Sequence, residues 1–365
     1  MNIWDYNFNY NGQAILFNLI LFIVSVWKYK SLYLGKIRTK GNYGFIFISL
    51  VLFSTWAYAE ADFYHYQFHY DMMKHNDIKS LAEPVYYWIA KNLPDNYYLW
   101  RLSIWGSAAL LMILSLKKIG VYASYVGLLM PVFFWHQFSL TRGALGFSLI
   151  IFALTYVFDN REKSSIHWIA IAALPLAAFF HTSIAVFLLV LLATIVIPFN
   201  TKTVRLSIFI FPLLYGSTML ITDKLLELDF LTAGAENLAE HYMEGQHADQ
   251  NFFGVAFDVL SFSGQLLMLY LSMNYIFNKK DDINRAVFVL AKYGYVLVYI
   301  SFLFYGQVLS SFVSSRFLHA STFPLIVVYS YYMQHHNING KDRLAITLLG
   351  VYAFYELIYP MYKWW

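Results

Sequence analysis

Long stretches with almost no charge limit what this chain can fold into. They include residues 15–27, 43–59, 110–116 and 121–135. A helix of about 20 apolar residues spans a bilayer, and it satisfies its own backbone hydrogen bonds, as lipid requires. A membrane β-barrel instead needs alternating strands of about ten residues, which these solid apolar blocks do not resemble. The blocks therefore predict an all-α, polytopic integral membrane protein.

The composition agrees with this prediction. Hydrophobic residues make up 59% of the chain and charged residues 13%, whereas soluble domains carry about 25% charged residues. Many Tyr and Trp residues, such as Tyr98 and Trp100, lie at block ends, where an interfacial belt places them. The chain has no cysteine, which excludes disulfides and thiol catalysis. Its net charge of +4 follows the membrane loops, so it does not predict nucleic-acid binding.

The blocks divide into about twelve predicted spans within a single transmembrane domain, residues 1–365. Two longer segments, 60–98 and 223–252, are predicted to lie on the outer side. The first apolar block lacks a basic n-region and a small-residue cleavage site, so we expect no cleavable signal peptide. The spans are predicted near 12–28, 42–59, 99–116, 119–136, 143–158, 166–180, 183–198, 205–222, 253–277, 286–306, 316–333 and 343–360.

The distribution of lysine and arginine predicts the orientation, because cytoplasmic loops are enriched in both. If the loop from Lys28 to Lys40 is cytoplasmic, sixteen basic residues fall inside and eight outside, with Lys292 within a span. Treating 166–198 as one helix would change this count to 12:12 and give a helix of about 50 Å, too long for a core of about 30 Å. We therefore predict two short spans, with His181 at an outer turn.

Three arginines fall on the predicted outer side, against the usual charge bias. Arg142 opens one span and Arg316 opens another, and both are candidates for binding an anion, since an arginine fork matches phosphate geometry. The alternative for each is an arginine that extends to the interface. Arg101 follows Tyr97, Tyr98 and Trp100, so it is either a third substrate-binding residue or an anchor in the aromatic belt.

Other outer polar residues are candidates for proton transfer. His181 lies between two apolar runs and is either a general base or a histidine that caps a turn. Glu60 and Asp62 follow a span and are bases, sugar-binding groups or ordinary interfacial charges. Glu83 precedes Pro84, a pair that favours the start of a helix. Since no metal-ligand motif is found and His335–His336 lacks partners at useful spacing, we expect no metal or cofactor.

Four short motifs together resemble the EpsG-type polysaccharide polymerases, which group with the Wzy O-antigen polymerases. They are Glu83–Pro84 before a span, Thr141–Ala144 at the start of a span, Phe180–Ser183 about 40 residues later, and Arg316. The family usually has Gln or Arg where this chain has Thr141. The resemblance covers residues 55–335, and the order and spacing of the motifs carry more weight than any one of them.

The resemblance implies a membrane glycosyltransferase with a GT-C-like helical bundle in the bacterial inner membrane. Its substrates would be oligosaccharide repeats on undecaprenyl pyrophosphate, joined at the periplasmic face into O-antigen or a related polysaccharide, as in lipopolysaccharide biosynthesis. A chain-length regulator protein is a possible partner. In this reading, Arg142 and Arg316, with Glu83 and Arg101 nearby, bind substrate, while His181 and Glu60 or Asp62 act at the acceptor hydroxyl.

Two other functions remain open at this level. A lipid-linked oligosaccharide flippase has a similar number of spans, but it is expected to carry charges deep within many helices. An O-antigen ligase usually has one very large outer loop, whereas this chain divides its outer residues between two segments.

Overall fold

The computed structural model describes residues 23, 27, 30, 40–55, 61–75, 84–133, 141–159, 165–180, 184–196, 199–200, 202, 206, 210, 252–303 and 308–363. All regular secondary structure in these residues is helical, which confirms the all-α prediction. The helices are α2 (Tyr43–Thr55), α3 (Ala61–His75), α4 (Pro84–Asn92), α5 (Tyr97–Ile119), α6 (Ala123–Phe133), α7 (Thr141–Phe158), α8 (Ser165–Ala177), α9 (Ile184–Val196), α12 (Phe252–Asn278), α13 (Arg285–Leu303), α14 (Val308–His335) and α15 (Gly340–Lys363).

Most of these helices coincide with predicted spans. All except α3 and α4 overlap one of them, while α3 and α4 lie in the segment 60–98. Apart from a few single residues, the spans predicted at 12–28 and 205–222 and the segment 223–252 lie outside the described residues. By length and composition, α5 alone among the described helices passes as a full bilayer span. Four shorter apolar helices accompany it, at Tyr43–Leu52, Gly143–Phe158, His167–Ala177 and Ile184–Val196.

The region 166–198 forms two helices, as predicted. Helix α8 ends at Ala177 and is followed by a turn at residues 178–180, and α9 begins at Ile184. One boundary prediction was wrong. Helix α14 begins at Val308, so Arg316 lies two turns inside this helix and not at its start. Four serines are spread through residues 308–315, and they interrupt the apolar run in the first turns of the helix.

Local sequence signals explain several helix ends. Asn96 caps α5, because its side chain accepts a hydrogen bond from the Leu99 amide at 3.2 Å. Gly120 ends the same helix in a left-handed conformation, with φ of 83°, which glycine adopts without steric cost. Pro84 is the first residue of α4, where its missing N–H is not needed.

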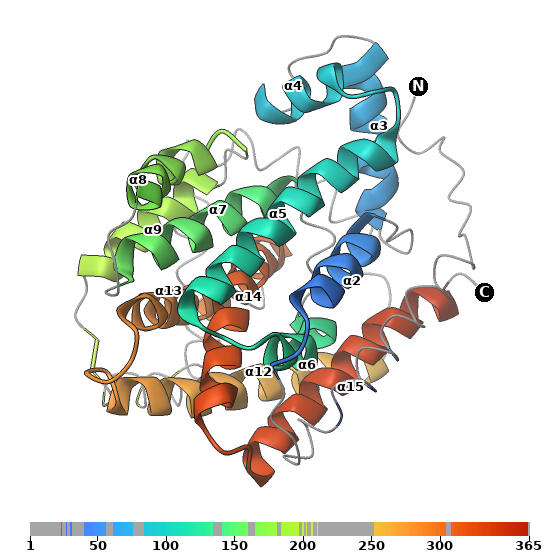
Figure 1. Ribbon diagram of the computed structural model, residues 1–365. Helices are drawn as coiled ribbons and strands as arrows, with labels where there is room; N and C mark the ends of the chain where they lie inside the picture. The colour runs from blue at the N-terminus through green and yellow to red at the C-terminus, as the bar shows by residue number, and fades with distance from the viewer. Residues whose placement is uncertain are drawn as a thin grey trace, which may run out of the picture.

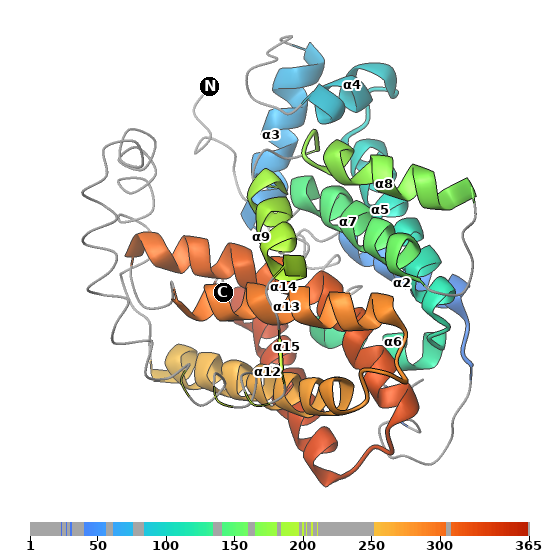
Figure 2. The same ribbon diagram turned by 90° about the vertical axis from the view of Figure 1, so that its left-hand side faces the viewer.

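The helices pack as one layered bundle. Helix α5 packs against α2 on one side and α7 on the other, and α7 in turn packs against α8 (Figure 1). A second group pairs α13 with α14 and α12 with α15 (Figure 2). Helix α13 joins the two groups through its contacts with α7 and α9.

One end of the bundle holds the connections predicted to be cytoplasmic. Gln334, near the end of α14, donates to the carbonyl of Gly120 at 3.0 Å and accepts from the Tyr122 amide at 2.6 Å. Lys118 at the end of α5 forms an ion pair of 3.1 Å with Asp159 after α7, and Asn284 before α13 donates to the same carboxylate. Connections far apart in the sequence therefore meet at this end of the bundle. We call it the opposite end, because it lies across the bundle from α3 and α4.

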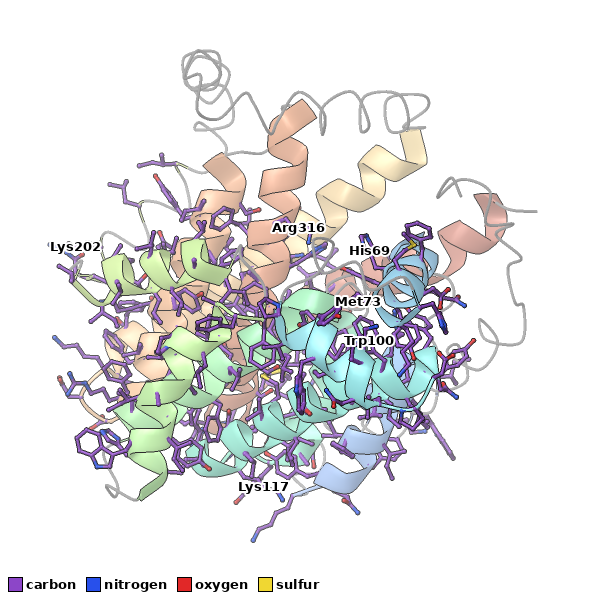
Figure 3. The ribbon with its side chains drawn as sticks, turned by 90° about the horizontal axis from the view of Figure 1, so that it is seen from above. His69, Met73, Trp100, Lys117, Lys202 and Arg316 are labelled. Carbon is purple, nitrogen blue, oxygen red and sulfur yellow. The ribbon has the colours of Figure 1, made fainter. Side chains whose placement is uncertain are left out.

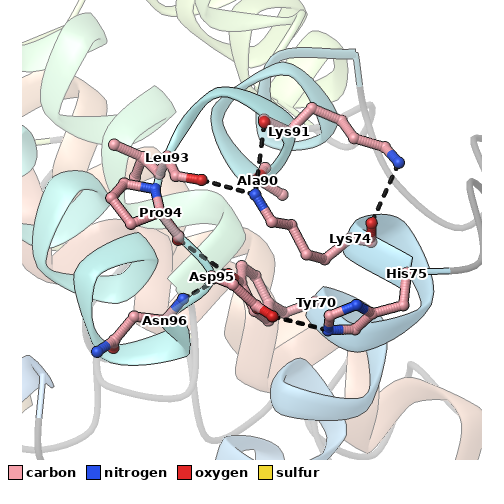
Figure 4. Close-up of polar contacts among 9 residues, drawn as sticks. All are labelled: Tyr70, Lys74, His75, Ala90, Lys91, Leu93, Pro94, Asp95 and Asn96. Carbon is pink, nitrogen blue, oxygen red and sulfur yellow. Dashed lines mark hydrogen bonds and ion pairs between the residues drawn. The ribbon is translucent and has the colours of Figure 1, made fainter.

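Helices α3 and α4 lie at the other end, at the top of Figure 1, and each caps the other. The Lys74 ammonium donates to the carbonyls of Leu93, Ala90 and Lys91 at 2.6, 3.1 and 3.4 Å (Figure 4). Lys91 in turn donates to the Lys74 carbonyl at 3.2 Å. A cation near the last carbonyls of a helix is stabilising. These contacts explain two lysines that run against the predicted charge bias.

Candidate functional site

Aromatic side chains join α3 and α4 to the first turn of α5. Trp100, which is buried, contacts the rings of Tyr70 on α3 and Tyr86 on α4, both at 5.9 Å. Tyr86 also contacts Phe180, after α8, at 6.2 Å. The turn that precedes His181 therefore lies beside α4, and we call this region of α3, α4, the start of α5 and the end of α8 the motif end.

The Tyr70 hydroxyl fixes the connection between α4 and α5. It accepts a hydrogen bond from the Asn96 amide at 2.9 Å and donates toward Pro94 and Asp95 at 3.3 Å (Figure 4). Burial, together with the nearby charge of Asp95, raises the pKa of Tyr70 to about 12, although the Asn96 amide acts in the opposite sense. The hydroxyl thus keeps its proton at any physiological pH and remains a hydrogen-bond donor.

Gly146 brings the start of α7 to the same end. A Cβ atom at this position would overlap Ile184 Cδ1, at the start of α9, and would lie 3.2 Å from the carbonyl oxygen of Ala177, at the end of α8. Residue 146 therefore has no room for a side chain. Arg142 is one turn before Gly146, so the first turn of α7 immediately precedes the contacts that this helix makes with the end of α8 and the start of α9.

Three phenylalanine contacts help to place Arg316. Phe147 on α7 stacks on Phe323 of α14 at 5.2 Å and contacts Phe187 of α9 at 4.9 Å, while Phe187 contacts Phe317 at 5.0 Å. Helices α7 and α14 both run from the motif end to the opposite end. Phe317, next to Arg316, contacts Phe187, and Phe187 contacts Phe147, so Arg316 lies near the place where α7, α9 and α14 meet. Its side chain is half-buried.

Arg101 is fully buried, which contradicts the belt-anchor interpretation, since an anchor would face the lipid interface. Its Nη1 donates to the Tyr97 hydroxyl at 3.2 Å, and its guanidinium lies 5.9 Å from the centre of that ring. Charged groups in membrane spans usually mark functional sites. The sequence signal that could have pointed to this burial is helical spacing, because Tyr97, Arg101, Ile104 and Ala108 share one buried stripe.

The remaining predicted site residues have no described side chains. Asp62 is the second residue of α3, and Arg142 is the second residue of α7. Glu60, Glu83 and His181 lie outside the described residues. Figure 3 looks onto the motif end from above, where His69, Met73, Trp100 and Arg316 lie over the middle of the molecule and Lys117 and Lys202 lie at its edge.

The segments that carry the four motifs thus meet at one end of the bundle. Three arginine positions there, on α5, α7 and α14, suit an anionic ligand with several oxygens. Within the described part of the chain, no group of three His, Asp or Glu side chains is placed to hold a metal ion.

Comparison with protein families identifies the chain. The sequence model of the EpsG family matches residues 42–365, most of the chain. The protein belongs to the EpsG family. This confirms the resemblance drawn from the four motifs, and together with the all-helical bundle it indicates a membrane protein. No curated protein and no solved structure matches the chain. The assignment of a function therefore rests on EpsG family membership and on the geometry of the motif end.

The two ends of this EpsG protein should be accessible from opposite sides of the membrane. Single cysteines at Thr182 and at the exposed Lys280 can be introduced into the cysteine-free chain. We expect a membrane-impermeant maleimide to label Thr182→Cys from outside in intact cells, and Lys280→Cys only after the membrane is opened. Labelling of both positions from the same side would contradict the two-span arrangement of α8 and α9.

Proposed function

We propose that this protein polymerises polysaccharide repeat units carried on undecaprenyl pyrophosphate, at the periplasmic face of the bacterial inner membrane. The observation that carries the proposal is the EpsG family match, which includes every motif segment that meets at the motif end. The bundle would act as a GT-C-like membrane glycosyltransferase, and a chain-length regulator protein would be its partner.

The proposed reaction transfers the growing chain from its lipid carrier to the next lipid-linked unit. A hydroxyl at the non-reducing end of the acceptor attacks the anomeric carbon of the donor. The new glycosidic bond forms as the bond from that carbon to the pyrophosphate oxygen breaks. The hydroxyl proton passes to a base, for which His181, Glu60 and Asp62 are the candidates. Undecaprenyl pyrophosphate leaves with the bonding electron pair.

Arginine at the motif end fits the leaving group in this reaction. Negative charge grows on the bridging oxygen in the transition state, and donors fixed in advance around it lower the barrier. Arg142, in the first turn of α7, and Arg316, on α14, would both serve one diphosphate. Glu83, before α4, would help shape the sugar-binding surface.

Deletion of the gene tests the proposed function. We expect cells without the protein to attach single repeat units to the lipid core but no long chains, as seen on a glycan ladder gel, with complementation restoring the ladder. A deletion strain that attaches no repeats at all would favour a flippase or a ligase and would contradict polymerisation.

A further inference from the structure

Helices α8 and α9 carry the most extensive exposed apolar surface in the described part of the chain. Both lie at the edge of the bundle, where α8 packs mainly on α7 and α9 mainly on α13 (Figure 1). Every exposed side chain described on these helices, and on the turn after α8, is apolar. The most exposed large ones are Trp168, Ile169 and Phe179 on α8 and its turn, and Leu189, Leu192 and Val196 on α9.

The distribution of side-chain sizes on α8 indicates that lipid covers this surface. Its small residues Ala170 and Ala173 pack in a buried cluster with Phe152 and Ala153 of α7, so the small side faces protein and the large side faces outward. Helices that pack against each other within a membrane use small residues at the contact. The outward side of α8 lacks that pattern, whereas acyl chains accept large apolar side chains without a specific fit.

Two contacts place the start of α8 at a membrane interface. The Nδ1 atom of His167 lies 3.2 Å from the carbonyl oxygen of Tyr156, on α7. The Tyr156 ring in turn lies 5.5 Å from the ammonium of Lys118, which forms the ion pair with Asp159 at the opposite end. Trp168, which is 73% exposed, is therefore close to the level of these charges, and an exposed Trp at such a level is typical of the membrane–water interface.

From this level, α8 and α9 are too short to cross a bilayer of ordinary thickness. The path from Trp168 to Phe180 consists of helix as far as Ala177 and then a tighter turn, ~20 Å in all. Helix α9 has 13 residues and is also ~20 Å long. The hydrocarbon core is ~30 Å thick, which α5, with 23 residues, is long enough to cross. Any tilt of the two short helices reduces their reach further.

We propose that the bilayer is thinned by ~10 Å along α8 and α9, so that the headgroups on the motif-end side lie level with Phe180. A bilayer adapts to a short apolar segment by thinning, at modest cost. At full thickness, the polar residues that follow Phe180 in the sequence would begin inside hydrocarbon, where an unsatisfied polar backbone group costs far more. This inference goes beyond the proposed function and does not depend on it.

The test is the depth of spin labels on the full-length protein in vesicles of palmitoyl-oleoyl phosphatidylcholine. Single cysteines replace Leu176 and Phe179, both exposed, in the cysteine-free chain. Collisions of the nitroxide with oxygen and with a nickel chelate report its depth. We expect the Phe179→Cys label close to the headgroups and the Leu176→Cys label ~6 Å deeper.

Three results would overturn the proposal, and none of them bears on the proposed function, because no sugar substrate takes part. In a bilayer of ordinary thickness, the labels at residues 176 and 179 would be equally deep, ~12 Å from the nearer surface. If neither oxygen nor the nickel chelate reaches these labels, another protein surface covers α8. The third result concerns α9, as follows.

Val186→Cys gives an independent reading on α9, and it decides the question if Phe179→Cys does not fold. Val186 is exposed and lies two residues after the start of α9. Its label should lie ~3 Å below the headgroups in a thinned bilayer, whereas ~13 Å would overturn the proposal. Leu110→Cys is the matched control, because Leu110 is exposed on α5 eight residues from Lys118, and its label should lie ~12 Å deep.

Discussion

Replacing Arg142 with alanine is expected to abolish polymerisation and to leave the amount of protein in the membrane near the wild-type level. The residue lies in the first turn of α7, where the helix dipole adds to its positive charge. Removing one such donor to a transition-state anion typically lowers the rate ~100-fold or more. Arg142→Lys should also be strongly impaired, because a lysine cannot make the bidentate contact.

The measurement for Arg142 is a chain-length ladder recorded beside membrane protein abundance. Arg285→Ala serves as a control for loss of an exposed arginine at a helix start, and it should give a normal ladder. Normal ladders from Arg142→Ala would show that this residue only extends to the interface, and the diphosphate site would then have to be sought around Arg316.

Gly146→Leu is expected to lower activity at least ~100-fold by a different route. The larger side chain must displace α7 from the carbonyl of Ala177 and from Ile184, which border the His181 segment. Displacements of about 1 Å between reacting groups can cost this much in rate. Overpacking of a buried position also costs about 1–3 kcal/mol of stability, so the unfolding temperature should fall.

Three further variants separate the effect of close packing at residue 146 from a general effect of replacing a helical glycine. Gly106→Leu changes a glycine of α5 whose added Cβ would meet nothing within 4 Å, and it should leave activity and stability unchanged. Gly146→Ala should have a smaller effect than Gly146→Leu, and adding Ile184→Val, which removes the overlapping Cδ1 atom, should restore it. A normal ladder from Gly146→Leu would show that polymerisation does not need the close packing of α7 on α8 and α9.

Hydropathy predicted the helices that carry apolar residues on all sides. Helices α5 and α9 are examples, because lipid and neighbouring helices both favour apolar side chains. The division of 166–198 followed from helix length and charge distribution, and the structure confirms that two helices form there. Helix α3 was missed, although Tyr66, Tyr70 and Met73 lie on one buried stripe at helical spacing. Charged and polar residues are spread among its apolar ones, so no continuous apolar run revealed it.

The grouping of the arginines was harder to predict than the arginines themselves. Arg142 and Arg316 could be selected from their position at predicted span ends. The packing that brings their helices together depends on contacts between distant residues, such as Phe147 with Phe323, which no local pattern encodes. Arg101 was hidden for a related reason. The aromatic residues around it resemble an interfacial belt in sequence, whereas in the bundle Tyr97 and Trp100 are buried and pack against α3 and α4.

The fastening of α3 and α4 has a consequence for how a long product is handled. Moving these helices away from α5 would break the Tyr70 hydrogen bond to Asn96 and the ring contacts of Trp100 together, while the Lys74 contacts keep α3 and α4 joined to each other. At about 1 kcal/mol for each hydrogen bond, such an opening would be rare in any one catalytic cycle. In the proposed reaction, the surface that α3 and α4 present to the first repeat unit is then the same surface that meets the last. In that reaction, successive additions would take place on one unchanging surface, and the length of the polymer would not be sensed by this part of the protein.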